Sequence, residues 1–527
     1  MSAGSPSIRA TLRHLPFRAL VSAGLLYFIG NAMQAMAAAW LMVEVSGSSF
    51  LAALVQTAVF LPMFLLVLPA GVLADTHDRR RLMMSALAVQ AGVLVLMALL
   101  FLLGGAGPGV LLVLTFAAGC AAAMLSPPWN SAIVDTVPRD ELPQAITVVS
   151  ISYNGARAVG PALAGVVYAF GGAGTVFAAS VLGVVALALA VRAHPPRPHP
   201  PSRLPAERLW GGMLSALRFA RHSETLLAQL VRVGAYSAAG SALWALLPVI
   251  GQRQLGLGSA GFGLLMGCLG TGAVLIGLQI GRLRTRFGLE AIVGAGGVVF
   301  AIAMAVSALS HSRPLTYGVL MAAGASWMAV MSTYNTATQT SVPPWVRARA
   351  TSLHTLAALG AFALGSAFWG ALSDLIGLAP ALGVATAAML AVLGLARPFP
   401  LRMGALPEVT QVGIAENLLV AHEPDPEAGP VAVEIRYPVR PEAAETFLDD
   451  VTALRGPRKR DGATFWRVYR DLSDPALFVE RFIVASWADY LHQRARATLA
   501  DQALEAALLP HLQPGAAPQL SHFIAER

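Results

Sequence analysis

The sequence has few charged residues for its length, since only 12% of its 527 residues are Asp, Glu, Lys or Arg, whereas 56% are hydrophobic. A soluble globular protein carries about 25% charged residues. The shortage excludes a disordered chain, a coiled coil and an ordinary soluble enzyme. It is typical of a protein that crosses a membrane many times. The 50 glycines and 34 prolines agree with that class, because both residues are more frequent in membrane helices than in soluble ones.

Cysteine is also scarce, and the motifs of several enzyme classes are missing. The two cysteines, Cys120 and Cys268, lie in apolar runs, which excludes a disulfide scaffold and a thiolate zinc site. The sequence contains no GxxxxGK[ST] phosphate loop, no HExxH and no GxSxG elbow. We therefore expect no enzyme activity, no metal and no cofactor in the membrane part, and no ATP-driven pump within this one chain.

The charges that are present are unevenly distributed. From Leu406 onward there are 12 basic and 18 acidic residues, and the part before it holds 24 basic and 10 acidic residues. The front of the chain is thus strongly basic and the tail is acidic, and the only lysine is Lys459. The net charge of +8 reflects arginines between apolar segments. It does not predict binding to nucleic acid.

A membrane helix needs about 20 mostly apolar residues, and the chain offers twelve such segments. The first is too long for the apolar core of a signal peptide and is followed by no small-residue cleavage site, so we expect it to be a span. The twelve predicted spans are 19–43, 51–73, 82–103, 109–135, 144–169, 173–192, 226–250, 260–281, 290–309, 315–338, 350–372 and 378–396.

The loop arginines predict the orientation of these spans. If the N-terminus lies in the cytoplasm, the cytoplasmic segments hold 20 arginines and the opposite segments hold 2, namely Arg253 and Arg313. The positive-inside rule therefore places both termini in the cytoplasm of a multi-pass protein of the inner (plasma) membrane. Between spans six and seven lies a proline-rich linker over 194–225. Its basic, amphipathic part around Leu209 to Arg221 is expected to lie on the membrane surface.

The two halves of the membrane part align as an internal repeat. A shift of 205 residues brings both a loop motif and the glycines of span five into register, and a shift of 210 residues aligns the loop after span two with the loop after span eight. The matched segments are 130–132 with 335–337, 137–138 with 342–343, Gly155, Gly160 and Gly165 with Gly360, Gly365 and Gly370, and 71–76 with 281–286. Two parallel six-helix repeats with a binding site near the midplane form a transporter architecture.

The loop 71–81, Gly-Val-Leu-Ala-Asp-Thr-His-Asp-Arg-Arg-Arg, resembles the signature loop of the major facilitator superfamily. It departs from that pattern at Thr76, which is usually basic, and at Asp78, which is usually glycine. In the second copy Thr285 stands where the aspartate would be. Within the superfamily, residues 10–400 are most similar to the branch of the enterobactin exporter and related secretion effectors. The resemblance implies twelve helices, export and coupling to protons, although the sequence shows no clear proton carrier at the midplane.

The signature loop is interpreted as a conformational latch at the cytoplasmic side. Gly71 would let its helix approach a neighbour, and Asp75 would bind a facing helix N-terminus or an arginine. Alternatively, the arginines only follow the positive-inside rule, which sets the orientation of the spans, and form no latch. The latch residues are Gly71, Asp75, Arg79, Arg80, Arg81 and Asp135.

Span five carries small residues and an arginine. Gly155, Gly160, Pro161 and Gly165 are similar to the Gly-Pro motif that the superfamily associates with exporters, with simple helix packing as the alternative. Arg157 lies about 14 residues into the span, too deep to reach the cytoplasmic face easily, and is predicted to bind substrate, adjust a carboxylate or form a buried pair. Arg232 in span seven is nearer its end, and we expect it to extend toward water.

Polar and aromatic residues of other spans complete the predicted substrate cavity, which would be largely apolar with few polar groups. The cavity residues are Arg157, Asn31, Gln34, Asn130, Tyr153, Trp244, Tyr334 and Asn335.

In the tail, the helical periodicity of apolar residues gives way to the alternation of apolar and polar residues that is typical of strands. Strands are predicted over 431–437, 463–469, 478–484 and 520–524, with helices over 441–454 and 487–509. The order β-α-β-β-α-β is ferredoxin-like. The tail resembles dimeric modules related to antibiotic-biosynthesis monooxygenases, but Tyr490 stands where that pattern has histidine, so dimerisation or ligand sensing is expected rather than oxygenase chemistry.

The sequence thus predicts a helical polytopic membrane protein with two six-helix repeats and a small α+β ferredoxin-like cytoplasmic domain. The predicted parts are the bundles 1–193 and 226–404, the linkers 194–225 and 405–428, and the cytoplasmic domain 429–527. Its expected function is secondary transport, exporting a small amphipathic molecule such as a siderophore or a drug by alternating access. A transporter-like ligand sensor, or a transporter fused to a tail monooxygenase, is the alternative. The expected partners are the lipid bilayer, a small-molecule substrate and a second copy of the tail.

Overall fold

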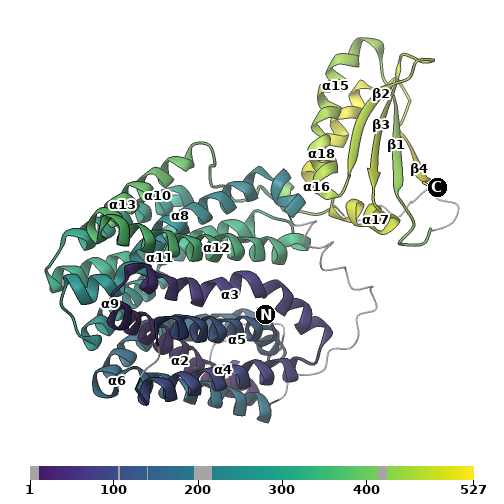
Figure 1. The fold of residues 1–527 in the computed structure, drawn as a ribbon. Helices are drawn as coiled ribbons and strands as arrows, with labels where there is room; N and C mark the ends of the chain where they lie inside the picture. Colours follow the sequence, from purple (N-terminus) through teal and green to yellow (C-terminus); the bar gives the residue numbers. More distant parts are fainter. Residues whose placement is uncertain (1–10, 105–106, 139–140, 195–216, 413–423, 527) are drawn as a thin grey trace, which may run out of the picture. The chain divides into compact units, whose positions relative to one another are not determined.

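The computed structural model describes residues 11–104, 107–138, 141–194, 217–412 and 424–526, and most of them are helical (Figure 1). In this part of the chain, eleven helical segments are long and apolar enough to cross a membrane. Most of linker 194–225 lies outside the described residues. The long helices are α2 (Leu15–Ser46), α3 (Ser49–Thr76), α4 (Arg79–Leu102), α5 (Pro108–Val134), α6 (Leu142–Ala193), α8 (Glu224–Val249), α9 (Ser259–Gly277), α10 (Ile280–Leu309), α11 (Arg313–Thr340), α12 (Pro344–Ile376) and α13 (Leu378–Leu393).

Helix α6 explains why eleven segments correspond to twelve predicted spans. It runs for 52 residues and contains both 144–169 and 173–192. At Gly172 the backbone leaves the helical region, with φ of 73° and ψ of −173°. Glycine adopts this conformation without the steric penalty that a Cβ brings. The two spans therefore follow each other across a kink, with no loop between them.

The described chain divides into two compact units that are not continuous in sequence. The first unit comprises Met1–Arg203, Arg232–Thr333 and Thr355–Arg397, and the second comprises Leu204–Val231, Tyr334–His354 and Pro398–Arg527. The first therefore holds most of the helical bundle. The second joins the ends of α8, α11 and α12 to the tail.

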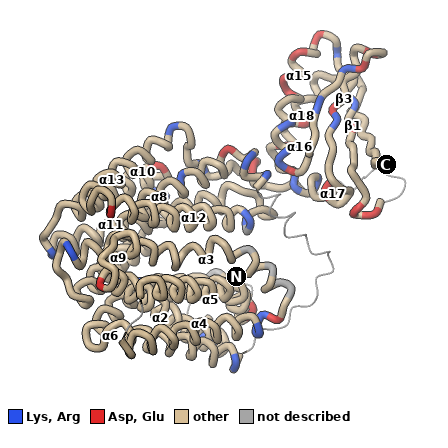
Figure 2. Tube along the Cα trace, viewed as in Figure 1, with Lys and Arg blue, Asp and Glu red and all other residues tan. Residues whose placement is uncertain are grey.

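Charged residues of the bundle gather at the ends of its helices, and the middles are almost free of them (Figure 2). Arg79, Arg80 and Arg81 begin α4, and Arg192 ends α6. We call this the arginine-rich end of the bundle, which the positive-inside rule predicts to be cytoplasmic. At the opposite end lie Arg253 and Arg313, next to the turns that precede α9 and α11.

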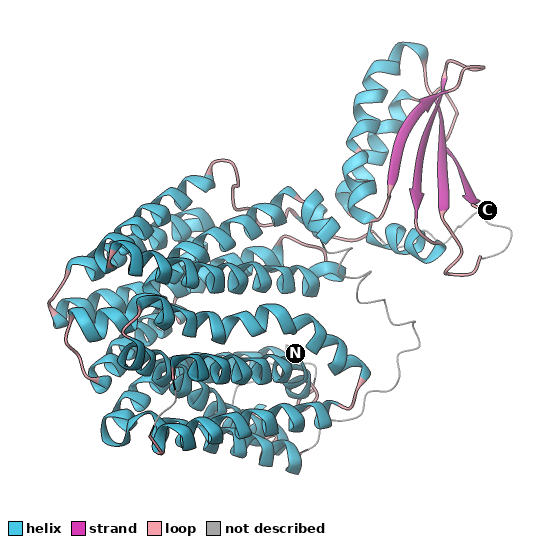
Figure 3. Cartoon of the chain, in the orientation of Figure 1, coloured by secondary structure: helices cyan, strands magenta, loops and turns pink. Residues whose placement is uncertain are grey.

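The tail contains a four-stranded antiparallel sheet with strand order β2-β3-β1-β4 (Figure 3). Alternate residues of β1, from Val431 through Val433 to Tyr437, are buried beneath helices that cover one face of the sheet. This alternation is what predicts the strand from the sequence. The elements are β1 (Val431–Pro438), α15 (Ala444–Ala453), α16 (Arg455–Asp461), β2 (Phe465–Arg470), β3 (Leu477–Val484), α17 (Trp487–Arg496), α18 (Leu499–Leu508) and β4 (Gln519–Ile524).

One predicted helix of the tail is wrong, because 487–509 forms two helices. The chain leaves the helical conformation at Ala497 and Thr498. Thr498 then starts α18 as its N-cap, accepting a hydrogen bond from the Asp501 N–H, while the Asp501 carboxylate accepts one from the Thr498 N–H. This reciprocal capping favours a new helix start over continuation of α17.

Candidate functional site

Two predicted latch residues, Arg79 and Asp135, form an ion pair with each other. Arg79, in the first turn of α4, lies 3.3 Å from the carboxylate of Asp135, which follows α5. Both side chains are mostly buried. The side chain of Asp75 lies outside the described residues. A Cβ at Gly71 would meet no atom within 4 Å, so close helix packing does not explain that glycine.

The other charged residues of the loop have different partners. Asp78 is the N-cap of α4, and its carboxylate accepts the Arg81 N–H at 2.8 Å. Arg80 donates from Nη2 to the carbonyl of Arg192 at 3.2 Å, which joins the start of α4 to the end of α6. The sequence departs from the family pattern at Asp78, and the structure shows that the departure supplies a helix cap.

The small residues of span five lie at two helix crossings. A Cβ at Gly160 would stand 2.7 Å from the Ala32 Cβ of α2, and a Cβ at Gly165 would stand 2.6 Å from the Ser259 carbonyl oxygen of α9. Gly263 faces Gly165 across the second crossing, with the same lack of space. At Gly155, by contrast, a Cβ would meet nothing within 4 Å. Gly160 and Gly165 thus bring α6 against a helix of each repeat.

One face of α6 changes from buried to exposed along its length. Pro161 and Ala164 are buried near the crossing with α9. Toward the arginine-rich end the same face carries Ile146 and Tyr153, which are 56% and 44% exposed. Successive members of this face are three or four residues apart, so they share one side of the helix. The helix is packed near the opposite end and uncovered toward the arginine-rich end.

Arg157 lies where this face changes from packed to exposed. Its guanidinium carbon is 5.8 Å from the ring centroid of Tyr153 and 5.7 Å from that of Trp244 on α8. Both distances are within the range of cation–π attraction. Among the described residues no carboxylate forms an ion pair with Arg157. The exposed side chain therefore lies near two aromatic rings, with its N–H groups available to a ligand.

The remaining predicted cavity residues have varied surroundings. Asn31 accepts a hydrogen bond from Gln90 at 2.7 Å, and Gln90 in turn accepts one from Tyr27 at 2.9 Å. Gln34 is buried, whereas Asn130 is exposed. Tyr334 is buried in the second unit, where Asn335 accepts a hydrogen bond from Gln339. Arg157, Tyr153 and Trp244 are the predicted cavity residues that the structure brings together.

The sequence analysis missed a contact between the repeats at the opposite end. Asp374, near the end of α12, accepts hydrogen bonds from the Ser48 hydroxyl at 2.6 Å, the Ser49 N–H at 2.8 Å and the Phe50 N–H at 3.2 Å. The last two donors are unpaired N–H groups of the first turn of α3. A carboxylate of one repeat thus caps a helix of the other, a partnership that no local pattern signals.

Arg232 is buried and has an acidic partner that the sequence did not reveal. Its side chain is 2% exposed and its Nη1 lies 2.6 Å from the carboxylate of Glu290 on α10. The expectation that Arg232 extends toward water is therefore wrong. The pair removes the penalty of an isolated charge at this depth.

The tail contains a buried charged cluster and a Tyr–His pair. Glu480 is fully buried and accepts hydrogen bonds from Arg458, Trp466 and Tyr437, at 3.1, 2.9 and 3.0 Å. Separately, His522 of β4 lies 2.7 Å from the Tyr490 hydroxyl. Burial raises the pKa of Tyr490, while burial followed by the charge of Arg494 lowers the pKa of His522. Both groups of this pair are therefore neutral near pH 7.

Within the second unit, the tail is attached to the helix ends by aromatic and arginine side chains. The guanidinium of Arg496 stacks 4.3 Å above the ring of Trp345, at the start of α12. Arg218 donates to the Gly462 carbonyl at 2.9 Å, and Arg460 lies 5.7 Å from the ring of Phe219. The Val412 N–H donates to the Ala497 carbonyl, and the Thr410 carbonyl accepts from the N–H of Leu499, the first residue of α18. The tail thus packs directly against the ends of α11 and α12.

Several known transporters are similar to this chain in sequence or in structure. The chain is 27% identical over 389 residues to the multidrug efflux pump Tap of Mycolicibacterium fortuitum, a match that covers 69% of this chain and 90% of Tap. A bacterial homologue of the human lysosomal transporter Spinster, in an inward-facing unoccupied conformation, is similar in structure with a TM-score of 0.55 and 17% identity, covering 74% of this chain and 95% of that one. The nucleoside transporter NupG gives a TM-score of 0.56 and 13% identity, covering 74% and 100%.

A family model described as transmembrane secretion effector matches residues 6–527, and so includes the tail as well as the bundle. The structural relatives agree with the fold expected from the signature loop and the internal repeat. The resemblance to the enterobactin exporter in particular, and to monooxygenase modules in the tail, stays a prediction. The chain is a multi-pass membrane transporter of the major facilitator type, and it belongs to the transmembrane secretion effector family.

Proposed function

We propose that this protein exports a small amphipathic molecule from the cytoplasm by alternating access, with Arg157 in the substrate site. The observation that carries the proposal is the change along α6, which is packed against α9 at Gly165 and uncovered from Tyr153 toward the arginine-rich end. A substrate entering from that end reaches Arg157 at the last uncovered turn. The name of Tap, a multidrug efflux pump, supports the direction of transport.

The residues around Arg157 favour a ligand with both an aromatic or apolar part and an anionic group. Tyr153 and Trp244 offer flat apolar surface, and the guanidinium offers a planar pair of donors that matches a carboxylate or phosphate. A siderophore or an anionic drug has this chemistry. Asn31, Gln34, Asn130, Tyr334 and Asn335 remain proposed members of the same cavity.

Alternating access would require two closures, one at each end of the bundle. At the opposite end, the cap that Asp374 places on α3 and the crossing of Gly165 with Gly263 join the two repeats. At the arginine-rich end we assign closure to the latch of Gly71, Asp75, Arg79 and Asp135, with the cytoplasmic orientation predicted from the loop arginines. Coupling to protons is proposed from the family resemblance, with no carrier residue assigned.

For the tail we propose dimerisation or ligand sensing in place of oxygenase chemistry. Residues of the uncovered sheet face include Phe465, Tyr469 and Phe523, beside the oppositely charged pair Arg481 and Glu434. A face that carries both apolar and paired charged residues can meet a second copy of itself. The pair of Tyr490 and His522 leaves a fused enzyme as the alternative, testable by assaying the purified chain for oxygen consumption.

The test of the export proposal measures accumulation of an anionic and a cationic amphipathic dye in cells that express the protein. Arg157→Lys keeps the charge and loses the planar fork, so export of the anionic dye should fall by about tenfold, and Arg157→Ala should abolish it. Arg221→Ala, which removes an exposed arginine outside the spans, is the matched control and should export normally.

Two outcomes contradict this proposal. Full export by well-expressed Arg157→Ala would remove Arg157 from the substrate site. If wild-type protein lowers the accumulation of neither dye, and of no compound in a wider amphipathic panel, then a ligand sensor explains the fold better than an exporter does.

A further inference from the structure

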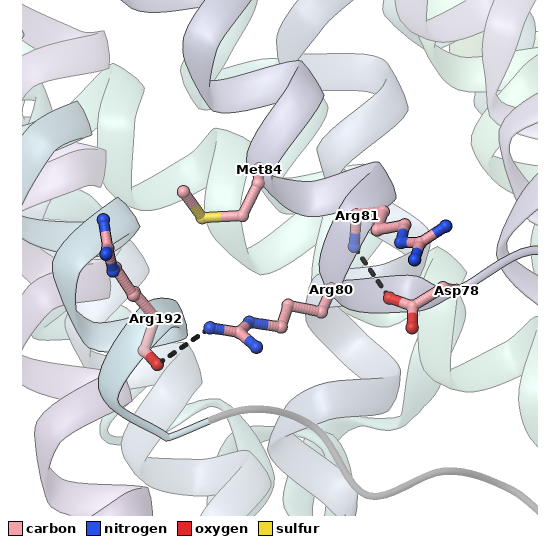
Figure 4. A pocket seen from close by; sticks show the side chains of 5 residues that line it. All are labelled: Asp78, Arg80, Arg81, Met84 and Arg192. Atoms are coloured by element: carbon pink, nitrogen blue, oxygen red, sulfur yellow. Dashed lines mark hydrogen bonds between the residues drawn. The ribbon is translucent and has the colours of Figure 1, made fainter.

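A basic pocket lies at the arginine-rich end, between the start of α4 and the end of α6. It has a volume of about 470 Å³ and is lined by Asp78, Arg80, Arg81, Met84 and Arg192 (Figure 4). Three of its five lining residues are arginines, and the one carboxylate is already used to cap α4. The pocket is therefore strongly cationic.

The three arginines of the pocket have no acidic partner in the described part of the chain. Arg79, their neighbour, is paired with Asp135, whereas Arg80 donates to the backbone carbonyl of Arg192. The stick view shows the Arg80 side chain extending from α4 toward Arg192 on α6 (Figure 4). The latch chemistry thus belongs to Arg79, and no described carboxylate forms an ion pair with the other arginines.

The pocket lies where the apolar runs of α4 and α6 end, which is the level of the membrane surface. In α4 the apolar run begins directly after Arg81, and in α6 it ends directly before Arg192. The hydrogen bond between Arg80 and Arg192 holds these two boundaries at the same level. A phosphate group at this depth is a lipid headgroup, because headgroups occupy the layer that borders the hydrocarbon.

A second pocket adjoins the first and shares two of its lining residues. It has a volume of about 310 Å³ and is lined by Leu73, His77, Asp78, Arg81, Leu82 and Ser85. Arg81 and Asp78 stand between a cationic compartment and one that includes leucine side chains. A ligand with a phosphate and an adjoining less polar part fits this pair of pockets better than a free phosphate ion does.

We propose that the pocket of Arg80, Arg81 and Arg192 binds the phosphate headgroup of an anionic phospholipid in the leaflet at the arginine-rich end. Guanidinium groups match phosphate oxygens with paired hydrogen bonds, and basic pockets between membrane helices are suited to anionic headgroups. The bound lipid joins α4 to α6 within the first repeat, next to the latch. The protein therefore requires anionic lipid for full stability.

The test uses the full chain in nanodiscs made of phosphatidylcholine alone or with phosphatidylglycerol. The variant Arg81→Gln/Arg192→Gln removes two charges and leaves the hydrogen bond between Arg80 and the Arg192 backbone in place. Arg282→Gln/Arg286→Gln is the matched control, because it removes two exposed arginines from the start of α10, outside either pocket. Native mass spectrometry counts bound phosphatidylglycerol, and thermal unfolding reports stability.

We expect wild type and the control variant to retain phosphatidylglycerol and to unfold at a higher temperature when it is present. The pocket variant should bind this lipid about thirtyfold more weakly, since each of its two replaced arginines contributes on the order of 1 kcal/mol near the surface. An equal loss in the control variant would overturn the proposal in favour of general surface charge. Equal stabilisation of wild type in phosphatidylcholine by inorganic phosphate would overturn it in favour of a free anion.

Discussion

The two copies of the signature loop start their following helix in different ways. In the first repeat Asp78 has φ of −61° and caps α4 with its side chain. At the matching position of the second repeat, 210 residues later, Gly288 has φ of 76° and interrupts α10 without any side chain. Both solutions let a new helix begin at the same place in the repeat. The two repeats therefore share the position at which the backbone changes direction. They differ in the residue used there, which is a capping aspartate in the first repeat and a glycine in the second.

The ion pairs near these loops differ as well. The first repeat joins α4 to the end of α5 through Arg79 and Asp135, both partly accessible. The second joins α8 to α10 through Arg232 and Glu290, with the arginine almost fully buried. The first is the pair that we propose as part of the latch. The second has one arginine with little access to water, which is suited to fixing a helix pair.

The largest effect that tests this comparison is expected at the pair of Arg232 and Glu290. Glu290→Ala leaves a charge that is 2% exposed without its carboxylate and should cost about 3 kcal/mol of folding free energy. Arg232→Met should cost less, because the Glu290 side chain is 41% exposed and water can solvate it. Thermal unfolding in detergent measures both. If Arg232→Met is the more harmful variant, the buried arginine is not the element that requires pairing.

A smaller effect is expected from exchanging the two helix starts. Asp78→Gly should cost only a few tenths of a kcal/mol, since glycine is an acceptable N-cap. Gly288→Ala should cost about 2 kcal/mol, because its φ and ψ are almost confined to glycine. A Cβ at Gly288 would meet no atom within 4 Å, so the loss would report backbone conformation alone. Equal unfolding temperatures for the two variants would show that the loops are interchangeable.

A smaller effect than that of Gly288→Ala is expected for the pair of Arg79 and Asp135. A double-mutant cycle with Arg79→Gln and Asp135→Asn should give a coupling of about 1 kcal/mol in stability, since both groups are partly reached by water. Each single variant should slow dye export more than it lowers stability, if the pair acts as a latch. Unchanged export in both variants would assign the pair to folding alone.

The sequence predicts this fold well where the signal is continuous along the chain. Twenty apolar residues and an alternating strand pattern are local signals, so the spans and the four strands of the tail follow from them. Side-chain partners are different, because 58 residues separate Arg232 from Glu290 and more than 320 separate Asp374 from Ser49. No spacing rule relates such residues. Arg157 and Trp244 are each predicted from the sequence as cavity residues, but the contact between them is not.

Glycine and capping residues limited the prediction at shorter range. Gly172 allows two spans to follow each other as α6, although the sequence suggests a loop at that point. Thr498 divides a segment whose periodicity indicates one helix. In both cases a single residue decides the outcome, through backbone freedom or through a side-chain hydrogen bond. A pattern averaged over many residues does not detect that.

Because the Asp374 carboxylate binds the first amides of α3, hydrogen exchange at these amides can be used to follow separation of the two repeats. The Ser49 and Phe50 amides are protected from exchange with solvent deuterium by an oxygen that belongs to the other repeat. In the alternating access that we propose, these two amides would meet water each time the two repeats separate at that end, while the Leu51 amide would keep its bond to the Ser48 hydroxyl. The exchange rate of two neighbouring protons therefore counts the openings of the molecule, with the third as an internal reference.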